Sequence, residues 1–276
     1  MVLSAEGRGK LAAARHSRGT ERTRPGLQVG APAPSGGYGA DVTKLRVDIW
    51  SDIACPWCYI GKRHLEQALD RFAHKQDVEV VWRAFELDAS APRIRDSSQS
   101  YAERLARKYG TQPQEAQRRI DHMVGVAAKD GLEFRFDHIK PGNTFDAHRL
   151  LHLGHERGIQ DAVKERLLRA YMTEGQAIGD PAVLVALARE AGLDEHDARD
   201  VLDGDRCAAE VRADEALARQ LGISGVPFFV LAGRLGVSGA QPADALLSAL
   251  DKAWAEIVKP EIELVEGAAC GPDGCD

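Results

Sequence analysis

Long hydrophobic runs are absent from this chain of 276 residues. No stretch approaches the roughly 18 to 20 consecutive apolar residues that a membrane-spanning helix needs. Met1 is followed by no apolar run of the kind found in signal peptides. We therefore expect no membrane partner and no secretory signal, and we predict a cytoplasmic protein.

Positive charge is scarce beyond the first 44 residues. Residues 1–44 carry seven Lys and Arg against three Asp and Glu, whereas residues 45–276 carry 29 against 39, a net charge of −10. A nucleic-acid partner would need a basic face on the folded part of the protein. We therefore expect no nucleic-acid binding.

Cysteine is also scarce, and its number is odd. The five thiols are Cys55, Cys58, Cys207, Cys270 and Cys275, so a framework that pairs every cysteine is excluded. In a reducing compartment, close cysteine pairs indicate reversible redox chemistry or metal binding more than permanent cross-links. The isolated Cys207 lies in a helical pattern and is interpreted as a packing thiol.

Hydrophobic periodicity begins at residue 45. Residues 1–44 are rich in Gly, Arg, Ala, Ser and Pro without a sustained period, which predicts a disordered N-terminal extension. The first alternating run predicts a strand, the apolar face that follows Pro56 predicts a helix, and the run from Val78 predicts a second strand. This order predicts a parallel unit, the first half of a core at residues 45–89.

The pattern between residues 90 and 222 is almost wholly helical. β character returns at 226–231 and 235–238, a predicted hairpin, and Pro242 opens an amphipathic helix. Neither β segment alone could form a closed core, so we predict an α/β fold in which an all-helical domain, residues 90–222, interrupts one sheet. The second half of the core is then residues 223–259, followed by a tail at 260–276.

A Cys-Pro-Trp-Cys sequence opens the predicted first helix. The spacing puts Cys55 and Cys58 on the same side of the first turn, close enough for a disulfide. The positive end of the helix dipole predicts a lowered pKa for Cys55, the expected nucleophile. Cys58 is expected to be the more buried thiol that resolves a mixed disulfide, while Pro56 and Trp57 influence the redox potential.

These segments resemble the DsbA family of the thioredoxin superfamily. The matching sequences are Cys-Pro-Trp-Cys-Tyr-Ile-Gly at 55–61 and Gly-Val-Pro-Phe-Phe at 225–229. Phe-Glu-Leu at 85–87, Asn-Thr-Phe-Asp-Ala-His-Arg at 143–149 and Val-Ser-Gly-Ala-Gln-Pro at 237–242 are similar to the FrnE-like branch, which is related to 2-hydroxychromene-2-carboxylate isomerases. The resemblance spans about residues 45 to 260 and implies a thioredoxin-like core with a helical insertion.

The resemblance also implies what this core does. It implies a cis bond between Val226 and Pro227, facing the Cys pair, where the Val226 backbone would hydrogen-bond a client polypeptide. The implied activity is thiol-disulfide oxidoreductase or disulfide isomerase on client proteins. No cofactor is expected beyond the dithiol itself, with glutathione or the thioredoxin system as electron partner. Both a monomer and a homodimer are compatible with this reading.

The tail contains a second pair, Cys270 and Cys275, around a Gly-Pro-Asp-Gly sequence that favours a tight turn. Such a turn would bring the two thiols together, which predicts a second redox pair able to exchange with Cys55. The FrnE-like branch includes members with such a tail.

Two other functions stay open. The first is a glutathione-dependent isomerase of a small aromatic or polyketide substrate, although the related isomerases have a serine at the position of Cys55. The second is a non-enzymatic zinc site built from both cysteine pairs. We predict no metal site, and we interpret His148, His152 and His155, which share a helical stripe, as packing residues.

Four polar residues near these motifs are secondary candidates. Asn143 and Thr144 are interpreted as caps of the helix that follows them. Asp52 and Glu86 are candidate proton-transfer carboxylates near the Cys pair.

Overall fold

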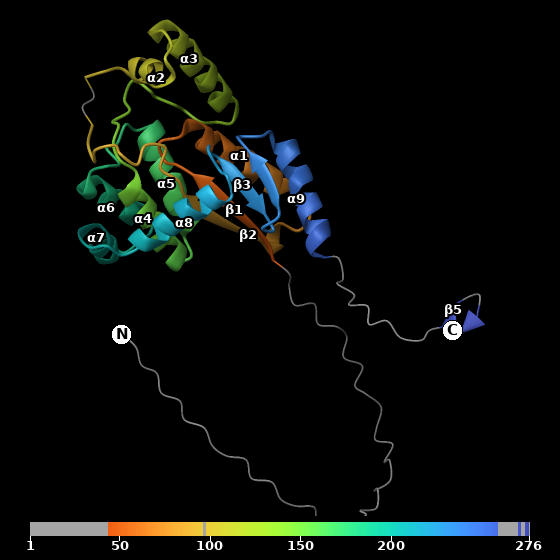
Figure 1. The fold of residues 1–276 in the computed structure, drawn as a ribbon. Helices are drawn as coiled ribbons and strands as arrows, with labels where there is room; N and C mark the ends of the chain where they lie inside the picture. Colours follow the sequence, from red (N-terminus) through yellow and green to blue (C-terminus); the bar gives the residue numbers. More distant parts are fainter. Residues whose placement is uncertain (1–43, 96–97, 259–269, 272–273, 276) are drawn as a thin grey trace, which may run out of the picture. The chain divides into compact units, whose positions relative to one another are not determined.

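The computed structural model describes residues 44–95, 98–258, 270–271 and 274–275 (Figure 1). The extension predicted at residues 1–44 lies outside the described residues except for Lys44, and so does most of the tail predicted at 260–276. Among the described helices, none combines the length and the apolar character that crossing a membrane requires.

A four-stranded mixed sheet forms the centre of the core, with strand order β2-β1-β3-β4. The parallel pair is β1 (Leu45–Ser51) and β2 (Val78–Ala84), and β1 also pairs antiparallel with β3 (Phe228–Leu231). The hairpin partner of β3 is β4 (Leu235–Ser238). Strands distant in sequence thus form one sheet, which confirms the predicted α/β class.

Helices lie between the strands and after β4, as the periodicity predicts. α1 (Pro56–Arg71) and the short 3-10 helix η1 (Lys75–Asp77) join β1 to β2, and α9 (Ala243–Ile257) follows β4. Every described helix between β2 and β3 belongs to the helical insertion: α2 (Tyr101–Tyr109), α3 (Pro113–Lys129), α4 (Phe145–Glu156), α5 (Gln160–Met172), α6 (Pro181–Glu190), α7 (Glu195–Asp203) and α8 (Ala208–Gln220). The described tail residues pair β5 (Cys270–Gly271) antiparallel with β6 (Gly274–Cys275).

Helix starts follow local sequence signals. Asp180 accepts a hydrogen bond from the backbone N–H of Ala182 at the head of α6, as its position before Pro181 predicts. Ser100 and Glu103 form a reciprocal capping box at the head of α2. Such caps satisfy backbone N–H groups that have no partner within the helix.

Alternation along the strands separates two apolar layers. Val47 and Ile49 of β1 pack with Phe229 of β3 against α1 and α9. Trp50 of β1 points to the opposite face, where it packs with α8 and with Phe228. Figure 1 shows α1 and α9 on one side of the sheet and α8 on the other. Because β1 is buried on both faces, two consecutive residues near its end, Ile49 and Trp50, are both apolar.

One buried carboxylate attaches the helical insertion to the sheet. Asp214 of α8 accepts hydrogen bonds from Arg83 Nη1 at 2.8 Å and from the Ala84 N–H at 2.9 Å, both on β2. Its Oδ2 also lies 2.9 Å from His152 Nε2 of α4. Although burial disfavours the charged form, these partners hold the pKa of Asp214 below its usual value.

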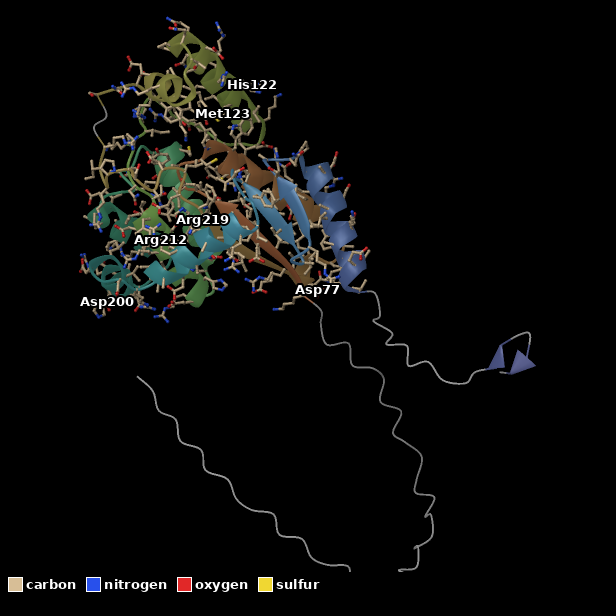
Figure 2. All side chains as sticks on the ribbon, viewed as in Figure 1. Asp77, His122, Met123, Asp200, Arg212 and Arg219 are labelled. Atoms are coloured by element: carbon tan, nitrogen blue, oxygen red, sulfur yellow. The ribbon has the colours of Figure 1, made fainter. Side chains whose placement is uncertain are left out.

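We therefore expect Asp214→Ala to lower the free energy of unfolding by about 3 kcal/mol, because the substitution leaves the buried Ala84 N–H without its acceptor and removes one of the two carboxylates that pair with Arg83. Urea unfolding measures the change. The matched control is Asp200→Ala on α7 (Figure 2), where the carboxylate is half exposed and lies 3.6 Å from His196 Nδ1; its effect should stay within about 0.5 kcal/mol. Equal effects of the two substitutions would contradict this account of the docking.

Candidate active site

The Cys pair lies at the head of α1, one short loop after β1. The Cys55 N–H donates to the Asp52 carbonyl at 3.3 Å, and the Cys58 N–H donates to the Cys55 carbonyl at 3.1 Å. Cys55 is the N-cap residue and Pro56 takes the first helical position, where no backbone N–H is needed. Both thiols are free; Cys55 is 5% exposed and Cys58 fully buried. The expectation that Cys58 is the inner thiol is confirmed.

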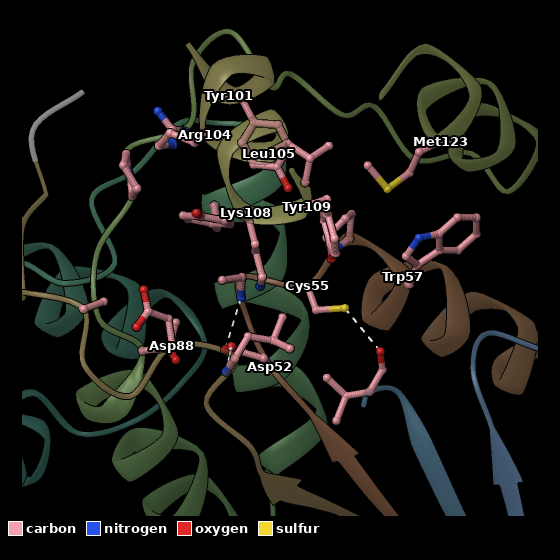
Figure 3. Close-up of a pocket in the computed structure, with 18 of the residues that line it drawn as sticks. Asp52, Cys55, Trp57, Asp88, Tyr101, Arg104, Leu105, Lys108, Tyr109 and Met123 are labelled. Atoms are coloured by element: carbon pink, nitrogen blue, oxygen red, sulfur yellow. Dashed lines mark hydrogen bonds between the residues drawn. The ribbon is translucent and has the colours of Figure 1, made fainter. Parts of the chain in front are cut away.

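The loop before β3 meets the Cys pair from the other half of the core. The bond between Val226 and Pro227 is cis, as the resemblance implies. The Cys55 thiol lies 3.5 Å from the Val226 carbonyl oxygen and donates to it (Figure 3). Gly61 of α1 permits this approach, because a Cβ there would lie 3.0 Å from Pro227 Cγ. Two segments 171 positions apart are therefore in direct contact at the reacting sulfur.

The reduced pair favours its negative charge on the inner sulfur, which differs from the expectation for Cys55. Burial works against a thiolate at Cys58, yet the hydrogen bond from Cys55 and the attraction of Lys164 lower the pKa of Cys58. The pKa of Cys55 is raised well above the ordinary value because its thiol donates to Cys58 and is buried. The Val226 carbonyl, an acceptor beside Cys55, acts in the same direction.

A buried lysine lies in electrostatic range of this pair. Lys164 of α5 is completely buried, and its Nζ has no hydrogen-bond partner within the described residues. Burial lowers the pKa of Lys164 to about 8, against the opposing attraction of Cys58, Asp52 and Cys55. Its ammonium also lies 5.4 Å from the ring centre of Trp82. Lys164 therefore supplies a positive charge close to a thiolate at Cys58, in a region without water access.

Asp52 is the nearest carboxylate along the chain. Its Oδ2 accepts the Leu87 N–H at 2.8 Å, and its Oδ1 accepts the Ala54 N–H at 3.3 Å and lies 3.4 Å from His148 Nε2. Burial disfavours its charge, but His148 and the backbone donors keep the pKa of Asp52 below its usual value. Asp52 is thus an ionised carboxylate beneath the site, on the same side as Lys164.

The histidine stripe does not converge on one point. His148 is buried beside Asp52, His152 pairs with Asp214, and His155 is exposed. Within the described ranges, no three His, Cys, Asp or Glu side chains gather as metal ligands. The zinc alternative depends on Cys270 and Cys275, whose side chains lie outside the described part of the chain.

The predicted capping segment has a second contact. Asn143 Oδ1 accepts the Phe145 N–H at 2.8 Å, while its Nδ2 donates to Glu86 Oε1 at 2.9 Å. Thr144 occupies the N-cap position, but its side chain does not cap the helix and instead hydrogen-bonds Asp52. Glu86 also pairs with Arg212, and burial raises its pKa. Glu86 is therefore bound in contacts with the insertion and is no free base at the sulfur.

A cavity of about 1580 Å³ opens in front of Cys55 (Figure 3). Cys55 and Trp57 line it from α1, Val226 lines it from the loop before β3, and α2 and α3 contribute much of the remaining wall. Cys58 lies behind Cys55 and does not line the cavity. The geometry therefore presents one sulfur to an incoming substrate and keeps the other as an internal partner.

Sequence reasoning missed two features of the site. One is Lys164, although a signal exists: it stands four residues after Gln160 and three before Leu167, both buried, so helical periodicity puts it on the buried face of α5. The other is the α2–α3 wall of the cavity. Nothing in the local sequence of those helices shows which side faces Cys55.

Comparison with known proteins identifies the family. Residues 46–251 match the model of the DSBA-like thioredoxin domain, and the chain belongs to this family. The structure is similar to that of a probable DsbA oxidoreductase from Streptomyces coelicolor, with 46% identity, a TM-score of 0.73, and coverage of 84% of this chain and 98% of that one. The resemblance stated from the motifs is confirmed.

Two further relatives have lower identity. The uncharacterized protein YwbO of Bacillus subtilis is 28% identical over 213 residues, which cover 75% of this chain and 96% of YwbO. The cytosolic disulfide reductase DsbM of Pseudomonas aeruginosa, solved with GSH, is 20% identical with a TM-score of 0.51, covering 77% of this chain and 96% of DsbM. The likeness to DsbM shows a shared fold.

Proposed function

We propose that this protein is a thiol-disulfide oxidoreductase with disulfide isomerase activity on client proteins, working through Cys55 and Cys58. The observation that carries the proposal is the placement of the two thiols: Cys55 lines a large cavity beside the Val226 carbonyl, and Cys58 is buried directly behind it. A nucleophile that reaches substrate and a partner that does not are what sequential thiol-disulfide exchange needs.

In the reducing direction, the Cys55 thiolate attacks one sulfur of a client disulfide and the other client sulfur leaves as a thiolate. Cys58 gives its proton to that client thiolate and, as a thiolate, attacks the Cys55 sulfur, so that the client sulfur bound to Cys55 leaves and a Cys55–Cys58 disulfide remains. The client gains two electrons and the pair loses two. The oxidising direction reverses both steps. For isomerisation, another client thiolate attacks the mixed disulfide at the client sulfur and releases Cys55 unchanged.

The shared proton of the reduced pair connects binding to attack. In the resting pair, Cys55 keeps the proton, and the Val226 carbonyl and the Cys58 sulfur are the alternative acceptors of its single S–H. A client backbone N–H that binds the Val226 carbonyl would compete with the Cys55 thiol for this acceptor. Transfer of the proton to Cys58 then leaves the thiolate on Cys55, where the client disulfide lies.

Lys164 acts on the dithiol through its positive charge. Its ammonium stabilises a thiolate at Cys58, which favours the reduced pair and makes Cys58 a better leaving group when a client thiolate attacks Cys55. Asp52 opposes this effect on Cys55, since its negative charge raises the pKa of that thiol.

The protein uses no cofactor other than its dithiol in this scheme, and glutathione or the thioredoxin system returns the pair to its working state. The fold shared with DsbM, a cytosolic reductase solved with GSH, supports glutathione as a partner and a cytoplasmic setting. The direct test is catalysis by the purified protein of insulin reduction with dithiothreitol and of reactivation of scrambled ribonuclease. Absence of both activities would refute the function.

A small-molecule isomerase is the second candidate. The aromatic side chains of Trp57, Phe85 and Tyr101 line the cavity beside Cys55, which suits a small aromatic substrate bound with glutathione. Isomerisation of an aromatic substrate that requires glutathione and continues in Cys58→Ser would favour this candidate, because such a reaction needs no resolving thiol.

We also propose that Cys270 and Cys275 form a second redox pair. The antiparallel pairing of β5 with β6 puts these two residues directly opposite each other, which supports a disulfide between them. Replacing both by serine should reduce isomerase turnover several-fold, because the recycling step is lost. The rate of one exchange reaction at Cys55, measured in a single turnover, should stay unchanged. Turnover of scrambled ribonuclease and disulfide mapping of the oxidised protein measure the effect. Unchanged turnover together with no Cys270–Cys275 bond would remove the second pair from the mechanism.

A further inference from the structure

The cavity wall opposite the Cys pair is basic in a protein that is acidic. Arg104, Arg107 and Lys108 of α2 line the cavity with Arg118 of α3. In the described part of the chain, no carboxylate oxygen lies within 4.0 Å of any of these four cations, and Arg107 attracts Glu103 only at longer range. The chain as a whole carries a formal charge of −6. Four cations without a close carboxylate partner on one wall of the reactive cavity therefore differ from the average surface.

The acidic side chains of the same cavity do not neutralise this wall, because each has other partners. They are Asp52 with its backbone donors and His148, Glu86 with Arg212 and Asn143, Asp88 with Arg95, and Glu115 with Arg119. Arg104 and Lys108 extend from α2 at the cavity, across from Asp52 and Cys55 (Figure 3). The α2–α3 wall of the cavity thus has a positive net charge, whereas Asp52 beside Cys55 stays negative.

The size and the remaining lining of the cavity indicate a polypeptide. Its volume of about 1580 Å³ exceeds the roughly 300 to 1,000 Å³ typical of sites for single small ligands. Three of the exposed large apolar side chains, Trp57, Leu87 and Tyr109, lie on its lining. An apolar rim with cations suits a flexible segment that has both apolar and acidic side chains.

We propose that the α2–α3 wall selects client polypeptides in which acidic residues flank the reacting cysteine. This inference rests on the proposed exchange chemistry of Cys55 and specifies the substrate class for that site. Carboxylates on either side of the client sulfur would contact Arg104, Arg107, Lys108 and Arg118 while the sulfur faces Cys55. The acidic remainder of the surface repels such clients, so the wall also determines their orientation.

The test uses peptides of about ten residues, each activated as a 2-pyridyl disulfide on its single cysteine, with Glu, Gln or Lys at the flanking positions. Attack of the Cys55 thiolate on the peptide sulfur releases pyridine-2-thione, whose absorbance gives the rate constant. At low salt the reduced wild-type protein should react about tenfold faster with the Glu peptide than with the Lys peptide. About 0.5 M salt should largely remove the difference.

Charge reversal provides the decisive comparison. Arg107→Glu/Lys108→Glu should invert the preference, so that the Lys peptide reacts faster. The matched control, Arg219→Glu/Lys252→Glu, makes the same change in net charge at exposed positions on α8 and α9 and should keep the wild-type order; Figure 2 labels Arg219 on α8, away from His122 and Met123 of α3. A control that inverts the preference as the wall variant does would overturn the proposal.

Two further outcomes separate this inference from the proposed function. If the neutral Gln peptide reacts through Cys55 but the flanking charge has no effect, the wall selects nothing and the exchange chemistry stands. If glutathione activated in the same way reacts as fast as the Glu peptide, the site takes small anionic thiols and the polypeptide assignment is wrong. If no peptide reacts faster than with Cys55→Ser, the proposed function fails and the inference fails with it.

Discussion

Replacing Cys55 by serine is expected to abolish both insulin reduction and ribonuclease reactivation. Cys55 is the thiol that lines the cavity, and a serine hydroxyl neither attacks a disulfide nor forms a mixed disulfide. Activity should fall to the rate of the reaction without enzyme. Cys58→Ser should behave differently, because the first attack remains possible and the resolving step is lost. Mixed disulfides between Cys55 and client proteins should then accumulate, visible on non-reducing gels and by mass spectrometry.

The matched control for both variants is Cys207→Ser. Cys207 is also a buried free thiol, but it lies at the head of α8 with its sulfur 3.6 Å from Glu156 Oε1. Its replacement should leave the exchange rate within about twofold of the wild type. Wild-type activity in both Cys55→Ser and Cys58→Ser would show that the proposed centre is wrong.

Lys164→Met should change the electrostatics of the pair without removing a sulfur. A positive neighbour stabilises a thiolate and lowers its pKa, so loss of the ammonium should raise the pKa of Cys58, by about one unit. The reduced pair then loses stabilisation, and the redox potential should become more negative by about 30 mV. Thiolate absorbance at 240 nm during a pH titration measures the first quantity, and equilibrium with glutathione measures the second.

Two comparisons distinguish this charge effect from a structural one. Lys164→Arg keeps a cation and should retain most of the wild-type shift, whereas Lys252→Met removes an exposed lysine of α9 and should change neither quantity. Thermal unfolding of each variant reports on folding separately; Met in place of a buried, unpartnered ammonium should not lower the melting temperature. An unchanged thiol pKa in a folded Lys164→Met protein would remove Lys164 from the mechanism.

Local patterns were sufficient for most of the core. Alternation in β1, the helical face after Pro56 and the turn signal at Gly233 each depend on neighbours a few residues away, so they could be predicted directly. The end of β2 depends on a distant residue instead: the Ala84 N–H donates to Asp214, 130 positions later. A contact of that kind leaves no trace in the strand's own sequence.

The same distinction between local and distant contacts applies to the reactive centre. The Cys-Pro-Trp-Cys spacing and the helix start at Pro56 specify two thiols on one turn, and this holds in the structure because helix geometry is local. The lowered pKa expected for Cys55 rests on the dipole of α1 alone, which is one contribution among several. The Val226 carbonyl and the Lys164 ammonium come from distant segments, and both favour a thiolate at Cys58 over Cys55.

By itself, the sequence determined the chemistry available to this protein: a dithiol at a helix start, a Val-Pro before a returning strand, and the order of strands and helices. These depend on residue type and short-range periodicity. Only the tertiary structure decided what surrounds the dithiol, namely the buried charge of Lys164 and the basic wall of α2 and α3. The physical reason is that electrostatic interactions and cavity walls depend on distance in space. The insertion brings α2, α3 and Lys164 to Cys55 from 46 to 109 positions away in the sequence.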